Sequence, residues 1–255
     1  MAPESLCNEV LKRQWFYEFD LPDGTRTTPY VPADVASLHP ARLAMATGAI
    51  ERTFGEDWSD LSVLDLACHQ GWFASHVARR DAGDVLAVDI RPEHLEDAKL
   101  IRDVYGLDRL RLEQRDVLAL EPGELGRFDV VLMLGLLYHV ENPVGLLRTA
   151  RSHASGLCLV ETQLAPNLAG PIDWGSYRFV KPLVGTFGIV DESEEVAGTN
   201  REANTVSISL FPSLEALVFL MGAVGFDRVE VLTPDDSNEQ LHSGKRAMVA
   251  GWVDS

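Results

Sequence analysis

Carboxylates follow or interrupt three segments that could each form a strand. Asp65 lies within the apolar run VLDL, Asp89 closes the apolar run VLAVD, and Asp116 follows a third predicted strand near residues 110–115. In a nucleotide-binding strand–helix–strand unit, an acid at the end of the second strand accepts hydrogen bonds from ribose hydroxyls. Asp89 has that position and is a candidate for binding a ribose. Asp116 has two open interpretations, as a ligand-binding acid or as a helix cap.

A tyrosine and a histidine close the most apolar run of the chain. FDVVLMLGLL begins at Phe128 and continues into Tyr138 and His139. Such a run is typical of a central parallel strand buried on both faces, and ligands of open α/β sheets bind beyond the ends of such strands. An imidazole there could take a proton from a hydroxyl. The alternative is a structural histidine that bonds to backbone in the turn before Pro143.

Alternating strands and helices must bring these residues together. Between residues 61 and 160, short apolar runs alternate with segments of helical period, the pattern of an α/β fold. Helices should start near Pro40, near Trp72, at Pro92 and after Asn142, and Gly55 should end the first of them. Strands are expected at residues 63–66, 85–89, 110–115, 128–137, 157–161, 229–232 and 247–253.

The segment VLDLACHQG resembles motif I of class I S-adenosylmethionine-dependent methyltransferases. That motif usually reads apolar-apolar-Asp-x-Gly-x-Gly-x-Gly. Here Ala67 and His69 stand where the first two glycines are usual, and Gly71 keeps the third. Two further segments, LYHVENP and WFYEFDLPDGTRTT, resemble segments of the tRNA wobble-uridine carboxymethyltransferase group within this class.

The resemblance implies a fold, a cofactor and a set of binding residues. The fold is a Rossmann-like class I methyltransferase fold, an α/β arrangement with a seven-stranded, mostly parallel sheet, helices on both faces and an antiparallel last strand. The cofactor is S-adenosylmethionine, with its ribose on Asp89 and its adenine near Asp116. The cofactor-binding residues expected from the resemblance and the motif positions are Asp65, Ala67, His69, Gly71, Asp89, Ile90, Asp116, Val117 and Leu134.

Two parts of the chain are expected to shape a substrate site. Residues 1–58 should form a helical and aromatic cap, and residues 59–255 a methyltransferase domain with a substrate-cap insertion at about 164–212, where Pro and Gly interrupt any helix. The expected substrate-binding residues are Trp15, Tyr17, Trp174, Tyr177 and Arg178. The alternative for the N-terminal aromatic residues is a packed flank of the core.

The composition of the chain disfavours several classes of binding partner. The formal net charge of −17 over 255 residues opposes a phosphate backbone and disfavours nucleic acid. The three cysteines have no spacing typical of a disulfide framework or metal site, so no metal is expected. Without a signal-peptide pattern or a run of about 18 apolar residues, the protein is expected to be cytoplasmic and not membrane-bound. The sequence gives no indication of oligomeric state.

The favoured function is S-adenosylmethionine-dependent methyl transfer to a small molecule, at a hydroxyl, with His139 and Tyr138 as the catalytic residues. Three alternatives remain open. Carboxymethyl transfer from a carboxylated donor needs basic side chains beside the methyl group, and the sequence does not locate them. A nicotinamide oxidoreductase is disfavoured by the missing glycines. A binding module without catalysis is consistent with His69 in place of a glycine.

Overall fold

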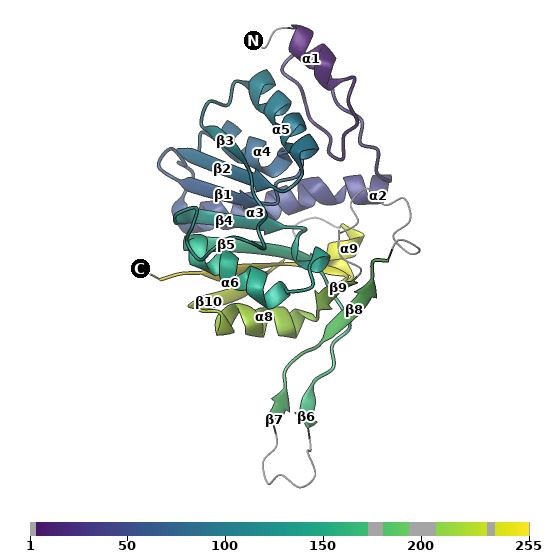
Figure 1. Ribbon diagram of the computed structural model, residues 1–255, viewed down its shortest axis with the longest axis vertical. Helices are drawn as coiled ribbons and strands as arrows, with labels where there is room; N and C mark the ends of the chain where they lie inside the picture. The colour runs from purple at the N-terminus through teal and green to yellow at the C-terminus, as the bar shows by residue number, and fades with distance from the viewer. Residues whose placement is uncertain (1–3, 173–180, 194–207, 234–237, 255) are drawn as a thin grey trace.

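The computed structural model describes residues 4–172, 181–193, 208–233 and 238–254, and its centre is one seven-stranded sheet (Figure 1). The strand order is β10-β11-β5-β4-β1-β2-β3. Neighbouring strands from β3 across to β5 pair in parallel, whereas β11 is antiparallel to both β5 and β10. This arrangement confirms the expected fold class. The strands are β1 Ser62–Leu66, β2 Asp84–Asp89, β3 Leu110–Gln114, β4 Phe128–Leu134, β5 Ala154–Gln163, β10 Arg228–Leu232 and β11 Arg246–Trp252.

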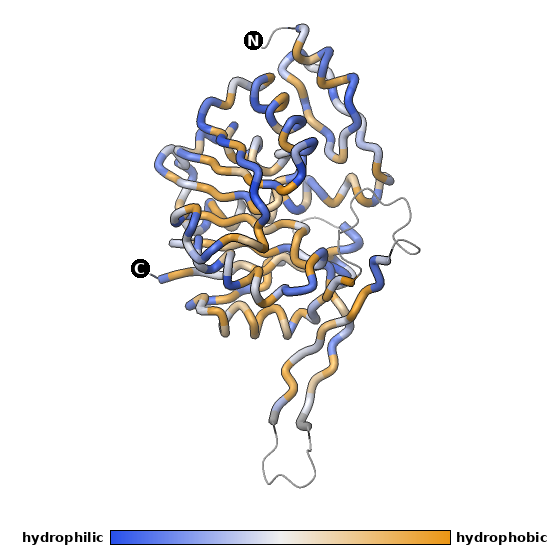
Figure 2. The backbone as a smooth tube through the Cα atoms, viewed as in Figure 1, coloured by the Kyte–Doolittle hydropathy of each residue, from blue (hydrophilic) through white to orange (hydrophobic). Residues whose placement is uncertain are grey.

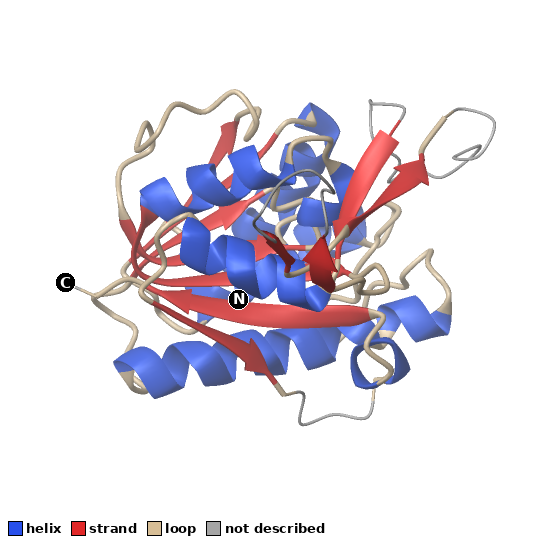
Figure 3. Ribbon diagram, turned by 90° about the horizontal axis from the view of Figure 1, so that it is seen from below, coloured by secondary structure: helices blue, strands red, loops and turns tan. Residues whose placement is uncertain are grey.

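Helices cover both faces of the sheet (Figure 3). Because successive strand side chains point to opposite faces, Val63 of β1 joins one apolar cluster and Leu64 joins the other. The first cluster also includes buried side chains of α3, α4 and α5, and the second includes those of α6 and α8. These helices are α3 Leu38–Phe54, α4 Trp72–Arg79, α5 Pro92–Tyr105, α6 Pro143–His153 and α8 Leu214–Ala223.

The helix boundaries agree with the signals in the sequence. Gly55 follows α3 with a φ of 86°, a backbone conformation that glycine adopts without strain. Pro92 opens α5. The side chain of Asn142 accepts a hydrogen bond from the backbone N–H of Gly145 and so caps α6.

The N-terminal segment runs from α1 (Glu4–Val10) to α2 (Ala33–Ala36) before the chain enters α3. Trp15 and Phe19 are almost fully buried in the first apolar cluster, and the indole N–H of Trp15 donates to the carbonyl of Val10. Between them, Phe16 turns toward the open edge of the sheet and lines a cavity there. Part of the N-terminal segment therefore packs in the core, as expected if its aromatic residues flank the core, and part of it forms a wall of the cavity.

The region expected to hold an insertion forms an arm that leaves the sheet (Figure 1). It contains two antiparallel pairs, β6 (Gly170–Ile172) with β7 (Lys181–Leu183) and β8 (Phe187–Asp191) with β9 (Ile208–Pro212). Figure 2 shows apolar residues along the central strands and also along the arm. At its base, the Leu210 amide donates to the carbonyl of Val140, which fastens β9 to the loop after β4.

A short helix, α9 (Glu239–His242), precedes β11. Within the described ranges, the structure contains no helix with the length and apolar character needed to span a bilayer.

Replacing the α6 cap gives a test of local stability. Asn142→Ala should lower the free energy of unfolding by about 0.5–2 kcal/mol, because the Gly145 amide loses its acceptor. Asn142→Asp keeps an acceptor at the same place and serves as the control. Chemical denaturation of the three proteins would check this, and equal stability of the alanine and aspartate variants would contradict the cap.

Candidate functional site

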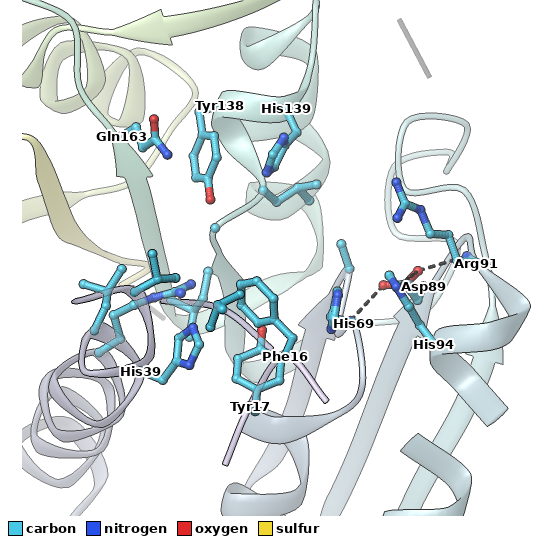
Figure 4. Close-up of a pocket in the computed structure, with 18 of the residues that line it drawn as sticks. Phe16, Tyr17, His39, His69, Asp89, Arg91, His94, Tyr138, His139 and Gln163 are labelled. Carbon is cyan, nitrogen blue, oxygen red and sulfur yellow. Dashed lines mark hydrogen bonds and ion pairs between the residues drawn. The ribbon is translucent and has the colours of Figure 1, made fainter. Parts of the chain in front are cut away.

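A cavity of about 700 Å³ lies where β1, β2 and β4 end (Figure 4). The strand order reverses direction between β1 and β4, and such a switch point is where open α/β sheets bind ligands. The cavity brings together these expected site residues: Tyr17, Ala67, His69, Asp89, Ile90, Asp116, Val117, Leu134, Tyr138 and His139.

The loop after β1 keeps a glycine-like backbone although two glycines are replaced. Ala67 and His69 have φ values of 57° and 52°, in the left-handed region. A residue with a side chain pays about 1–2 kcal/mol to adopt this conformation. The amide of Cys68 donates to the carbonyl of Val88, which holds the loop against β2. The loop therefore has left-handed backbone at both positions where the motif usually has glycine, although both residues carry side chains.

Asp89 receives hydrogen bonds from two loops. Its Oδ2 accepts the backbone N–H of His69 at 2.8 Å, and its Oδ1 accepts that of Arg91 at 2.9 Å. The ring of His94 lies 3.5 Å from Oδ1. Burial alone would raise the pKa of Asp89, but the attraction of His94 and the two amides outweigh it, so the pKa lies below its ordinary value. The carboxylate is ionised at neutral pH.

The outer end of the cavity combines a polar turn with apolar side chains. Asp116 is exposed, and its Oδ1 accepts the backbone N–H of Leu118, so it stabilises the turn after β3 as well as lining the cavity. Leu118 and Ile90 are each about half exposed beside it. A flat, partly apolar ligand with polar edges would fit this end.

Tyr138 and His139 lie on a single 3₁₀ turn, η1 (Leu137–His139), beyond the end of β4. The two rings are 4.2 Å apart between centroids. On its other side Tyr138 contacts Phe211 of β9, with centroids 5.6 Å apart. The base of the arm therefore supports this wall of the cavity.

A buried charged network stands behind Tyr138. Arg42 lies 3.0 Å from Oε2 of Glu161, and the Nε of Arg246 lies 3.3 Å from Oε1. The Nη2 of Arg246 donates to the hydroxyl oxygen of Tyr138 at 2.8 Å. Burial opposes the charge of Arg246, but Glu161 and Tyr138 outweigh it and raise its pKa. Both guanidinium groups line the cavity and stay charged.

His39 lies close to these cations and behaves differently. Burial, reinforced by the nearby Arg42, His69 and Arg246, lowers the pKa of His39 to about 3. The imidazole is therefore neutral at physiological pH and offers hydrogen-bonding without charge.

The side chain of Gln70 fastens the N-terminal segment to the loop after β1. Its Oε1 accepts the N–H of Phe16, and its Nε2 donates to the carbonyl of Gln14 and to Asp97. Phe16 in turn lies 5.1 Å from the ring of His69. The segment thus forms a wall of the cavity over the replaced glycine.

Several expected site residues do not line the cavity. Asp65 is buried behind the loop, Gly71 has a φ of 74° at the start of α4, and Trp15 belongs to the core. A Cβ on Gly71 would lie 2.8 Å from that of Ala98, so close helix packing explains this glycine. Trp174, Tyr177 and Arg178 lie outside the described residues.

Sequence reasoning missed residues that come from distant segments. Glu161 lies near the end of the apolar strand β5 and Arg246 begins β11, and a charge next to an apolar run was the signal available for both. The missed cavity residues with polar or aromatic side chains include Phe16, Tyr30, His39, Arg42, Arg91, His94, Gln163 and Arg246. In the described part of the chain, no cluster of three or more His, Cys, Asp or Glu residues could hold a metal ion.

Asp65 gives a pH-dependent prediction. Burial, reinforced by Asp89, raises its pKa to about 7, against the effects of the Ala74 amide and Arg42. Between pH 4 and 7 the folded protein keeps a proton that the unfolded chain releases, so stability should fall by up to about 1.4 kcal/mol per pH unit as pH rises. Asp65→Asn should remove this loss. Denaturation at several pH values measures the difference, and parallel curves for the two proteins would refute it.

Three comparisons with known proteins bear on the site. A family described as a methyltransferase domain matches residues 39–231, which is most of the chain. The ubiquinone biosynthesis O-methyltransferase of Psychrobacter cryohalolentis is 34% identical over 103 residues, covering 39% of this chain and 40% of that protein. The tRNA U34 carboxymethyltransferase of Aliarcobacter butzleri is 24% identical over 192 residues, covering 71% of this chain and 52% of that protein. The chain thus spans about half or less of these relatives' lengths.

Solved structures share the fold over the whole chain. The N-terminal domain of EvdMO1 with SAH bound matches with a TM-score of 0.71 and 23% identity, covering 100% of this chain and 98% of that one. Magnesium protoporphyrin IX methyltransferase from Synechocystis PCC 6803 with bound SAH matches with a TM-score of 0.58 and 13% identity, covering 98% and 94%.

The family match and the shared fold confirm the expected fold class, a class I methyltransferase fold. The resemblance to the tRNA carboxymethyltransferase group is confirmed as well. With a match over residues 39–231 and the complete seven-stranded sheet, the chain belongs to the methyltransferase domain family.

Proposed function

We propose that the protein transfers the methyl group of S-adenosylmethionine to a hydroxyl of a small molecule. One observation carries the proposal: a single cavity joins the loop after β1, the ionised Asp89, the turn at Asp116 and the Tyr138–His139 turn. The first three of these features would bind the donor, and His139 is the candidate base, so both functions would share one cavity.

The cavity residues fit the donor. Each oxygen of Asp89 accepts one backbone amide, and a carboxylate oxygen can accept a second hydrogen bond, so both ribose hydroxyls can be held. Ile90, Val117 and Leu118 offer apolar contact for an adenine, with Asp116 at its polar edge. The sulfur end of the donor would then point past Ala67 and Leu134 toward Tyr138.

The chain's own residues would act by positioning and by moving one proton. The donor supplies an electrophilic methyl group on a sulfonium. The hydroxyl oxygen bonds to the methyl carbon as the carbon–sulfur bond breaks, and the hydroxyl proton passes to the imidazole of His139. His39 is a poor candidate for this step, because a group with a pKa of about 3 holds a proton weakly at neutral pH.

A small acceptor is supported by the cavity and by charge. About 700 Å³ lies within the ordinary range for small-molecule sites. The formal net charge of −17 opposes nucleic acid. Among the relatives, those named ubiquinone biosynthesis O-methyltransferases favour an oxygen acceptor.

Identifying the ligand that copurifies with the protein tests the donor. Mass spectrometry should find S-adenosylmethionine or S-adenosylhomocysteine, and incubation with methyl-labelled donor and a panel of hydroxylated compounds should give a labelled ether or ester. A carboxylated donor as the bound species, with carboxymethyl transfer as the only reaction, would contradict the proposal.

Asp89 should be needed for donor affinity. Asp89→Asn removes the charge that strengthens bonds from the ribose hydroxyls, so the Kd for S-adenosylhomocysteine should rise about ten- to a hundredfold, corresponding to 1.5–3 kcal/mol. Asp129→Asn is a matched control, because Asp129 accepts the amide and hydroxyl of Ser62 at the opposite edge of the sheet. Calorimetry giving equal Kd values for the two variants would remove Asp89 from the donor site.

His139 should be needed for turnover. His139→Asn removes the base, so kcat should fall about 10²- to 10⁴-fold while donor affinity stays near that of the parent. His242→Asn, on α9, is the control for a histidine outside the cavity. A structural histidine would instead lower the melting temperature and leave kcat near the parent value per folded molecule, which would disprove the catalytic role.

A further inference from the structure

We propose that the acceptor is an aromatic hydroxy acid whose carboxylate is held by Arg246 and Tyr138. This inference rests on the proposed methyl transfer and names the substrate class of that same site. It begins from an excess of positive charge that the fold buries at the acceptor end of the cavity.

The buried network behind Tyr138 contains two cations and one anion. Arg42 is 4% exposed, Arg246 6% and Glu161 0%, and Glu161 is shared between the two guanidinium groups. A buried charge is costly unless it is paired and fully hydrogen-bonded. Within this network the cations outnumber the anions by one, and an anionic ligand in the cavity would balance the difference.

Both arginines have buried N–H groups without a hydrogen-bond partner among the described residues, Nε in Arg42 and Nε and Nη1 in Arg246, and Arg246 is the one that also contacts Tyr138. Its Nη2 donates to Tyr138, while Nη1, although buried, has no hydrogen-bond partner among the described residues. A guanidinium presents its N–H groups in a fixed planar fork that matches a carboxylate. The free Nη1 belongs to a residue that lines the cavity, so an anionic ligand there would supply the missing partner.

Tyr138 offers a second donor at the same place. Its oxygen accepts the Nη2–H of Arg246, which leaves the phenol's own O–H to donate to a ligand in the cavity. A carboxylate would thus receive bonds from a guanidinium and a phenol that already hold each other in position. Because the two donors are held in place before the ligand binds, the site should bind a carboxylate more tightly than a neutral group of the same shape.

The rest of the acceptor end favours a flat, apolar body. Phe16 and Tyr30 line the cavity with ring centroids 5.9 Å apart, and Phe16 also lies 5.0 Å from His39. Figure 4 shows Phe16, Tyr17 and His39 on one wall and Tyr138, His139 and Gln163 on the other. Rings of this kind contact a planar aromatic substrate well. Gln163 can bond to a ring substituent without adding charge.

Paired substrates test the inference. Hydroxybenzoates and hydroxycinnamates would be compared with their primary amides and with aliphatic hydroxy acids of similar size, by kcat/KM and by calorimetric binding to the S-adenosylhomocysteine complex. The acids should bind at least tenfold more tightly than their amides. In Arg246→Gln, the acid-to-amide preference should fall at least tenfold through KM, while Arg246→Lys should keep part of it.

Arg228→Gln is the matched control. Arg228 is exposed on the neighbouring strand β10 and stacks 3.7 Å from the Trp252 ring centroid, outside the cavity. Glu161 keeps Arg42 as a partner when Arg246 is replaced, so the variant should fold, and circular dichroism would verify it.

The possible outcomes distinguish a wrong substrate class from a wrong reaction. Equal use of acids and amides, or an unchanged preference in Arg246→Gln, overturns the hydroxy-acid inference and leaves hydroxyl methylation standing. Preference for aliphatic acids overturns the aromatic part. A carboxylate on the donor would satisfy the same guanidinium, so tight binding of carboxylated S-adenosylmethionine, lost in Arg246→Gln, with no methylation of any acceptor, overturns both the inference and the proposed function.

Discussion

The hydrogen bonds from the backbone amides of His69 and Arg91 to Asp89 are the constraint on which the site depends. They tie the loop after β1 to the loop after β2 across one ionised carboxylate. With that tie in place, the loop can keep its left-handed residues although Ala67 and His69 carry side chains. Backbone strain of this kind persists where the surroundings hold it, and it is typical of ligand-binding positions.

The side chain of His69 has a structural explanation within this frame. Its ring lies 3.8 Å from that of His94 and 5.1 Å from that of Phe16. A glycine would leave this space open. The imidazole instead connects the donor loop to the N-terminal segment, which Gln70 fastens from the neighbouring position. The replaced motif position and the N-terminal wall are therefore parts of one arrangement.

The buried network of Arg42, Glu161 and Arg246 contributes little to the stability of the fold, unlike the apolar core around it. Replacing such a buried group with apolar side chains is often neutral or stabilising, so buried charge is weak support for the fold itself. Its location beside Tyr138, at the inner wall of the cavity, is the basis of the proposed carboxylate recognition. The carboxymethyl alternative required basic residues beside the methyl group, and these arginines are cations that line the same cavity.

The sequence by itself determined the order of strands and helices, their caps and the acids at the strand ends. These features follow from local periodicity and from short-range rules, which is why Asp89, Asp116 and the Tyr138–His139 turn could be assigned to one edge of a sheet. It could not show that Asp65, Gly71 and Trp15 lie outside the lining of the cavity, because burial behind a loop is not visible in a local pattern. Only the tertiary structure decided which side chains from residues 16, 39, 42, 161 and 246 meet. Two of the contacts, Arg42 with Glu161 and Tyr138 with Arg246, join segments more than 100 residues apart in sequence, and such contacts depend on sheet order and helix packing rather than on neighbouring residues.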